Sequence, residues 1–183
     1  MITFGAKFIS SANIQKLGHD KKYREINTSF VKLSHESKKD CNVLCELAGW
    51  DSYDTFSKTI NDNFQNLSIQ KNILGYEFFA LTTQESNFEN LDPNNILGLL
   101  QTSERLKDNY IEYLQTNPEY MLGAATRKFK GIGKTMMNAY MKMLGKNKTI
   151  HLDSTPNAAD FYKRIGFITK EPDIEDLSLF IKI

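Results

Sequence analysis

Two kinds of hydrophobic pattern alternate along the chain and predict its elements. Apolar residues recur every three or four positions in four stretches, which predicts helices over 37–49, from Asp51 onward, over 131–145 and over 155–166. Period-two alternation or short apolar runs elsewhere predict strands over 2–9, 23–33, 75–82, 96–103, 109–116, 148–153 and 177–183. The first two of these strands show no clear period.

The order of these elements indicates the fold class. Two helices come before three successive strands, and the loops that join those strands predict an antiparallel meander. A helix, a strand, a second helix and a last strand follow the meander. The chain contains no internal repeat, linker or low-complexity tract, so the sequence predicts one α+β domain over 1–183.

Composition and charge exclude several classes of protein. Of the 183 residues, 40% are apolar and 25% charged, which is typical of a globular domain. A net charge of +1 argues against a generally basic coat for nucleic acid. No apolar run reaches the ~18 residues of a membrane span, and we find no secretory signal, so we expect a cytoplasmic protein. Cys41 and Cys45 share a helix face, where we expect two small core residues.

The stretch 126–135, TRKFKGIGKT, is the best candidate for a ligand site. Gly131 and Gly133 stand at a predicted helix start, where free backbone N–H groups and the helix dipole favour an anion. Between Tyr120 and Leu152 there is no acidic residue, but there are seven cations: Arg127, Lys128, Lys130, Lys134, Lys142, Lys146 and Lys148. This segregation of charge predicts a polyanionic ligand such as a pyrophosphate. The alternative is a solvated basic helix start without a ligand.

Two better-known phosphate motifs do not fit this stretch. Residues 133–135 match the GK[ST] tail of a P-loop, but Lys128 stands where that motif needs its first glycine. The dinucleotide fingerprint needs a third glycine, and Met136 stands in its place.

The same stretch resembles a known family when it is taken with two neighbours. Residues 111–118, IEYLQTNP, form a predicted strand that ends in proline, and residues 158–167 read AADFYKRIGF. With KFKGIG at 128–133, these segments resemble the strand, the [RQ]xxGx[GA] acetyl-CoA signature and the AxxFYxxxGF segment of the GNAT acyltransferases, the Gcn5-related N-acetyltransferase superfamily. The resemblance covers about 109–167 and implies a mixed, mostly antiparallel central sheet flanked by helices.

The chain departs from the family pattern in four ways. Lys128 replaces the Arg or Gln of the signature. The loop 119–127 is longer than the family's usual spacer of about three residues, and Thr155 stands where the family often has Asn. Residues 1–72 match no family segment residue by residue.

The resemblance implies acetyl-CoA as cosubstrate and assigns roles to particular residues. It implies that Tyr162 protonates the leaving thiolate; the alternative is a core tyrosine packed beside Phe161. We call the stretch 128–135, with its two glycines at the helix start, the glycine cradle. Glu112, on the strand before the cradle, is the candidate base, the alternative being a solvent-facing carboxylate. Glu119, His151 and Asp153 are weaker candidates. The implied cofactor contacts are Leu114, Gln115, Thr116, Lys128, Phe129, Lys130, Gly131, Ile132, Gly133, Lys134 and Thr135.

The activity that these residues imply is transfer of an acetyl group to a primary amine. The acceptor stays open between a small amine, a lysine side chain and a protein N-terminus; Trp50, Tyr53 and Phe56 are candidates for an apolar acceptor wall or for core packing. Two alternatives are a catalytically inactive acyl-CoA-binding or protein-interaction module, and a nucleic-acid domain that uses Phe129 and Tyr140. The place of Tyr140 on the apolar stripe of its helix argues against the nucleic-acid domain. We expect no metal site and no membrane partner, and a homodimer is possible.

Overall fold

The computed structural model describes residues 5–50, 56–67, 75–121, 127–169 and 177–183. Its strands form one sheet in the order β6-β1-β2-β3-β4-β5-β7-β9-β8. The strands are β1 Lys7–Leu17, β2 Tyr23–Leu33, β3 Glu77–Thr82, β4 Ile96–Arg105, β5 Asp108–Thr116, β6 Phe129–Lys130, β7 Thr149–Asp153, β8 Ile168–Thr169 and β9 Ser178–Lys182. The helices are α1 Lys38–Leu47, α2 Ser57–Leu67, α3 Ile132–Leu144 and α4 Pro156–Arg164. The α+β prediction is confirmed.

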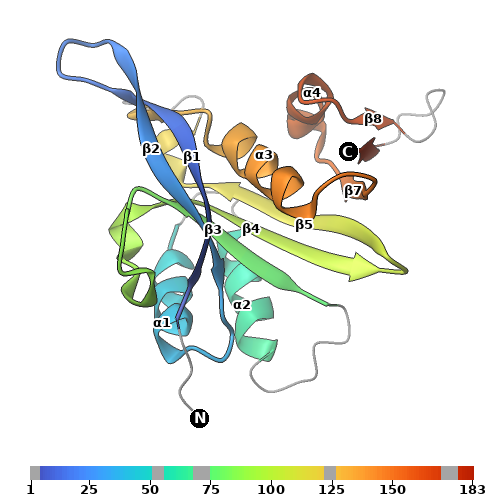
Figure 1. Cartoon of the computed structure of the whole chain (residues 1–183), viewed down its shortest axis with the longest axis horizontal. Coiled ribbons are helices and arrows are strands. Elements are labelled where there is room, and N and C mark those ends of the chain that lie inside the picture. The colour runs from blue at the N-terminus through green and yellow to red at the C-terminus, as the bar shows by residue number, and fades with distance from the viewer. Residues whose placement is uncertain (1–4, 51–55, 68–74, 122–126, 170–176) are drawn as a thin grey trace.

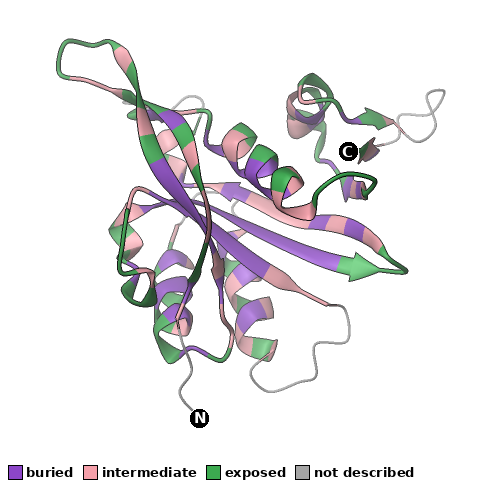
Figure 2. Cartoon of the chain, in the orientation of Figure 1, coloured by how far each residue is buried: buried purple, intermediate pink, exposed green. Residues whose placement is uncertain are grey.

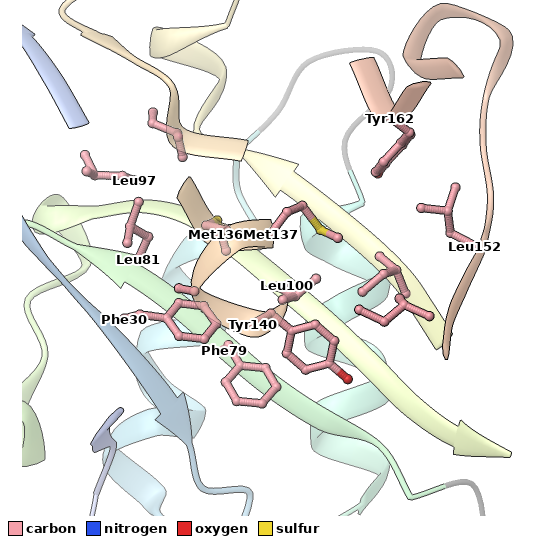
Figure 3. Close-up of a cluster of buried hydrophobic side chains, with 14 of the residues drawn as sticks. Phe30, Phe79, Leu81, Leu97, Leu100, Met136, Met137, Tyr140, Leu152 and Tyr162 are labelled. Carbon is pink, nitrogen blue, oxygen red and sulfur yellow. The ribbon is translucent and has the colours of Figure 1, made fainter. Parts of the chain in front are cut away.

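Helices α1 and α2 lie on one side of the sheet and α3 and α4 on the other (Figure 1). The sheet thereby separates two hydrophobic cores. Strand β3 is a continuous apolar run because both of its faces are buried: Phe79 and Leu81 face the core under α3 and α4, whereas Phe78 and Ala80 face the core under α1 and α2. In the α3 core the ring centroids of Phe30 and Phe79 lie 5.2 Å apart, and those of Phe79 and Tyr140 lie 5.6 Å apart (Figure 3). The middle of the sheet is buried, while the β1–β2 hairpin extends into solvent (Figure 2).

Strands β3 to β5 form the predicted antiparallel meander, and β2 also pairs antiparallel with β3. The next pairing is different, because β5 runs parallel to β7, and the pairing ends at Ile111 and Leu152. Just past this point Glu112 is an extra residue in β5: Ile111 pairs with Thr102 and Tyr113 with Gln101. Such a β-bulge bends a strand, so β5 departs from β7 over its second half.

Two predictions about where elements lie in the first 72 residues are corrected. Strand β1 lies at Lys7–Leu17 and not at 2–9, because a hairpin register that pairs Leu17 with Tyr23 sets its position. Helix α2 begins at Ser57, later than Asp51, and Asp51 and Tyr53 lie outside the described residues.

The cysteine prediction is wrong for Cys45. The buried face of helix α1 carries Val43, Leu44 and Leu47. Cys45 follows Leu44 and is therefore rotated about 100° from it around the helix axis, which leaves Cys45 exposed. Cys41 is half-buried.

None of the described helices is long and apolar enough to cross a bilayer.

Candidate active site

A cleft of about 720 Å³ opens where β5 parts from β7. This volume lies within the range of small-molecule sites. Strand β5 and the turn after it, β6 and the residue range just before it, the start of α3, and one side of α4 with the turn that follows it form the walls. They contribute Leu114, Thr116, Tyr120, Met121, Arg127, Phe129, Gly131, Ile132, Gly133, Lys134, Asn157, Ala158, Phe161, Tyr162, Arg164 and Ile165.

The two glycines at the start of α3 keep the end of this cleft open. Gly131 is the N-cap with a φ of 86°, a conformation that side chains disfavour, and a Cβ there would meet nothing within 4 Å. The first helical bond runs from Thr135 N–H to the Gly131 carbonyl, so the N–H groups between them have no partner within the helix. A Cβ on Gly133 would lie 3.3 Å from the Phe161 ring, so α3 and α4 approach closely there.

The cradle and the residues just before it contact the β1–β2 hairpin. Strand β6 pairs with β1, and the Leu17 N–H donates to the Lys128 carbonyl at 2.8 Å. The Tyr23 hydroxyl donates to the Arg127 carbonyl at 2.6 Å, and the Lys130 ammonium lies 3.7 Å from the centre of the Tyr23 ring. No local sequence signal announces these contacts, because about one hundred residues separate the partners.

The side chains of adjacent residues in β5 point to opposite faces of the sheet. Leu114 and Thr116 line the cleft, while the Gln115 side chain points to the face covered by α1 and α2. There its Oε1 accepts from the Phe56 N–H at 3.0 Å, and its Nε2 donates to the Thr116 carbonyl at 2.6 Å. Buried Gln115 therefore joins the start of α2 to the strand that forms the cleft.

Tyr162 lies on α4 with its ring against Phe161 and Phe167, at centroid distances of 4.9 and 5.7 Å. Burial raises the pKa of the Tyr162 hydroxyl to about 12. No described residue forms a hydrogen bond with that hydroxyl. A tyrosine with a raised pKa stays protonated at neutral pH, so this side chain can donate a proton into the cleft but cannot act as a base there.

Glu112 lies on the opposite face of the sheet from the cleft. Thr102 hydrogen-bonds Tyr140 of α3, so its neighbour Ser103 points toward the α1–α2 face. Glu112 accepts a hydrogen bond from Ser103 there and forms an ion pair with Arg105. Its carboxylate is nevertheless at the bulge, where β5 leaves β7.

Comparisons with known proteins identify the family. A family model described as "Acetyltransferase (GNAT) domain" matches residues 54–179. This chain belongs to the GNAT acetyltransferases. A search of curated proteins finds no significant match.

Solved GNAT structures share the fold. A GNAT-family acetyltransferase from Desulfovibrio desulfuricans is 11% identical with a TM-score of 0.56, covering 85% of this chain and 98% of the other. The PaiA N-acetyltransferase from Thermoplasma acidophilum, solved with coenzyme A, is 19% identical with a TM-score of 0.52, covering 86% and 100%. Tetrahymena Gcn5 is 11% identical with a TM-score of 0.52, covering 100% and 96%. At these identities the likeness shows the fold.

Membership in the GNAT family makes acetyl-CoA the cosubstrate of this chain. The cleft fits such a molecule: the glycines leave open space at the helix start, and Arg127, Lys134 and Arg164 line the walls. No carboxylate is among the described lining residues.

The structure brings together part of the predicted cofactor set. Those on the cleft wall are Leu114, Thr116, Phe129, Gly131, Ile132, Gly133 and Lys134. Lys130 lies on Tyr23, and the Thr135 hydroxyl donates to the Asn13 carbonyl at 3.0 Å, so both connect the cradle to the hairpin. Lys128 lines a neighbouring cavity.

The weaker base candidates lie away from the cleft wall. His151 Nε2 is 3.4 Å from Asp108 Oδ2, and its ring stacks on Tyr110 at 5.0 Å. Asp153 accepts from the Ser178 hydroxyl at 2.7 Å. The Glu119 N–H donates to Asn117 in the turn that follows β5.

Two residues of the proposed apolar wall are described. Trp50 and Phe56 are half-buried against the α1–α2 core, and the Phe56 ring lies 5.1 Å from that of Tyr113. Within the described part of the chain, no three His, Cys, Asp or Glu side chains gather to hold a metal ion.

Proposed function

We propose that this protein is an N-acetyltransferase that moves the acetyl group of acetyl-CoA to a primary amine on a small molecule or a protein. The observation that carries the proposal is the opening between β5 and β7. Tyr162 and the glycine cradle line one side of β5 there, and Glu112 lies at the bulge on the other side.

The cradle binds the pyrophosphate in this proposal. The N–H groups of Ile132, Gly133 and Lys134 are free at the start of α3, where the helix dipole favours an anion. Arg127 and Lys134 add positive charge on the cleft wall. The backbone of β5 at Leu114, Gln115 and Thr116, freed from β7, supplies hydrogen-bonding groups to the pantetheine arm.

The chemistry requires two proton transfers. Acetyl-CoA supplies the acetyl group as a thioester; a carbon–nitrogen bond forms and the carbon–sulfur bond breaks. An alkyl amine with a pKa of ~10.4 is mostly protonated at neutral pH, so its proton must be removed. In this proposal Glu112 accepts that proton from the amine on the α1–α2 side, and Tyr162 donates a proton to the departing sulfur.

An inactive acyl-CoA-binding or protein-interaction module is the second candidate. The observation that favours it is the ion pair between Arg105 and Glu112, because the guanidinium competes with an amine proton for the carboxylate. In an active enzyme the amine must reach Glu112 despite this pairing, which is possible because the Arg105 side chain is 45% exposed.

An assay of thiol release separates the two candidates. The purified protein is incubated with acetyl-CoA and, in turn, a polyamine, a peptide with an internal lysine and a peptide with a free N-terminus. We expect at least one amine to accelerate thiol release and to gain the mass of one acetyl group. Tight acetyl-CoA binding without acetylation of any of these three amine classes would favour the inactive module.

The proposal includes a cytoplasmic location and one functional domain over 1–183. Both described cysteines are free thiols, as is common in reducing compartments. A homodimer remains a prediction.

A further inference from the structure

The ion pair between Glu112 and Arg105 lies on the α1–α2 face of the sheet and uses only one oxygen of the carboxylate. The Ser103 hydroxyl and the Nη2 of Arg105 both donate to the same oxygen, Oε1. No described residue donates to the second oxygen, Oε2, and this atom is not sealed from solvent. The carboxylate of Glu112 therefore has one oxygen that an incoming cation can reach.

Arg105 likewise has donors that it does not use. Its Nη2 is the one guanidinium nitrogen with an acceptor among the described residues, and the side chain is 45% exposed. The Cζ atom lies 4.8 Å from the centre of the Tyr110 ring, so the guanidinium rests on an aromatic face while it contacts Glu112. A guanidinium carries five N–H donors in a planar fork, and the unused ones suit a second carboxylate.

Aromatic rings lie beside this ion pair at the edge of the α1–α2 core. The rings of Phe56, Tyr76 and Tyr113 are half-buried against that core, and the centroids of Phe56 and Tyr113 are 5.1 Å apart. Burial raises the pKa of the Tyr76 hydroxyl, the negative charge of Glu112 raises it further, and Arg105 opposes the rise. Tyr76 is therefore within electrostatic range of both charges, and Tyr113 directly follows Glu112 in β5. These surroundings suit an aromatic group bound next to the pair.

We propose that the acetyl acceptor is a free α-amino acid with an aromatic side chain, an inference that rests on the proposed function with Glu112 as its base. The α-ammonium group contacts Oε2 of Glu112, and the α-carboxylate contacts the unused N–H groups of Arg105. One carbon carries both groups of the ligand, so the zwitterion matches two protein charges that already lie side by side. Each of the four charges then keeps an opposite partner.

The other classes of amine fit this pair less well. The second ammonium group of a short diamine or a polyamine would lie close to Arg105 and be repelled by it. A lysine side chain and a peptide N-terminus carry no carboxylate next to the amine. They would compete with Arg105 for Glu112 and offer the guanidinium no new acceptor. A free amino acid supplies both charges.

The reaction stays that of the proposed function. The α-ammonium group first gives one proton to Glu112, and the neutral nitrogen then forms a bond to the acetyl carbon as the carbon–sulfur bond breaks. Tyr162 protonates the sulfur. The second proton of the nitrogen leaves to solvent, from which Tyr162 is reprotonated. The products are an N-acetyl amino acid and CoA.

The test compares L-phenylalanine with L-phenylalaninamide in the thiol-release assay. The amide keeps the amine and the ring but lacks the carboxylate, so we expect kcat/KM to be at least about tenfold higher for phenylalanine, as for one charge-assisted contact. Arg105→Gln should lower kcat/KM about tenfold for phenylalanine without lowering it for the amide. Arg24→Gln, which removes another exposed, ion-paired arginine from the hairpin, is the matched control and should keep the wild-type preference.

Calorimetry with CoA in place of acetyl-CoA measures acceptor binding without a reaction. We expect phenylalanine to bind the CoA-saturated protein, and Arg105→Gln to weaken that binding about tenfold while Arg24→Gln leaves it unchanged. Arg105→Lys keeps the positive charge but not the planar fork, so its loss should be smaller than that of Arg105→Gln.

Absence of phenylalanine binding, equal kcat/KM for phenylalanine and its amide, or binding that does not depend on Arg105 would overturn this inference. Acetylation of any other amine in the same assay would then still support the proposed function. Binding of phenylalanine that depends on Arg105, without acetylation of any amine, would support the amino-acid site and contradict the proposed function.

Discussion

The two faces of the sheet along β5 differ in how their polar groups are used. On the α3–α4 face, glycines, free N–H groups and cations surround an open cleft whose described lining holds no carboxylate. On the α1–α2 face the polar side chains are paired: Gln115 with Phe56, Glu112 with Ser103 and Arg105. One face thus suits a polyanion, and the other carries the carboxylate that we propose as the base.

The bulge at Glu112 connects these two environments. A regular strand paired to β7 along its whole length would leave no passage through the sheet. The pairing ends at Ile111 and Leu152, directly before the extra residue Glu112. In the proposed mechanism a cosubstrate on one face and an amine on the other meet at this point of β5.

On the cleft face, Tyr162→Phe should have the largest effect. It keeps the ring packing but removes the hydroxyl, so kcat should fall roughly 10- to 1,000-fold, while CoA affinity and Tm stay close to wild type. The matched control is Tyr140→Phe, a second tyrosine whose pKa burial raises to about 12 but which lies in the core beside Thr102. Equal kcat losses in both variants, measured where chemistry limits the rate, would show that Tyr162 acts only through packing.

On the α1–α2 face, buried Asp40 should make stability depend on pH. Burial raises the pKa of Asp40 from 3.8 to about 6, although N–H groups of Ser34 and Ala6 partly oppose the rise. The raised pKa means that the folded protein holds this proton more tightly than the unfolded chain. The corresponding stabilisation is complete below about pH 4 and is lost as pH rises through about 6.

The variant Asp40→Asn measures this effect directly. Its free energy of unfolding relative to wild type should improve by up to about 3 kcal/mol between pH 4 and pH 7. Asp62→Asn, an exposed change on α2, is the control and should show no such trend. A pH-independent difference for Asp40→Asn in chemical denaturation would refute the buried-charge interpretation.

Glu112→Gln tests the proposed base on the same face. We expect kcat/KM to fall about 10- to 100-fold and the acidic limb of the pH–rate profile to flatten, with acetyl-CoA affinity almost unchanged. Glu77→Gln is the control, because it also breaks an ion pair on the sheet, with Lys32, but lies on β3. Wild-type rates for Glu112→Gln from pH 6 to 9 would assign the proton to another group or to water.

Tyr23→Leu should have the smallest effect and tests whether the hairpin holds the cradle. It removes both the hydroxyl bond to Arg127 and the ring under Lys130, so KM for acetyl-CoA should rise about 3- to 10-fold with kcat unchanged. Tyr23→Phe keeps the ring and should recover part of the loss. If neither variant changes KM, the hairpin contributes only to the fold.

The sequence was informative wherever the signal is local. The apolar stripe of α3, with Ile132, Met136 and Tyr140 buried, and the bounds of β2 at Tyr23–Leu33 agree with prediction. The glycines at the start of α3 were also recognisable, because a positive φ and a close helix approach both select glycine.

The parts that sequence did not reveal depend on register and on distant contacts. The Arg105–Glu112 ion pair requires the bulge that shifts β5 against β4. The bond from Phe56 to Gln115 joins residues 59 apart, and that from Tyr23 to Arg127 joins residues 104 apart. The sequence around each of these residues contains no signal of its distant partner. The contacts between the hairpin and the cradle could therefore be found only from the fold.

Calorimetric titration of Gly133→Asp tests most directly whether the glycine cradle at the start of α3 binds the pyrophosphate of acetyl-CoA. A carboxylate at this position would add bulk beside Phe161 and place negative charge where the phosphates bind. We expect at least a ~100-fold loss of acetyl-CoA affinity, whereas the isosteric Gly133→Asn, which adds bulk without charge, should lose much less. Wild-type affinity in a folded Gly133→Asp variant would contradict binding of the pyrophosphate at the cradle.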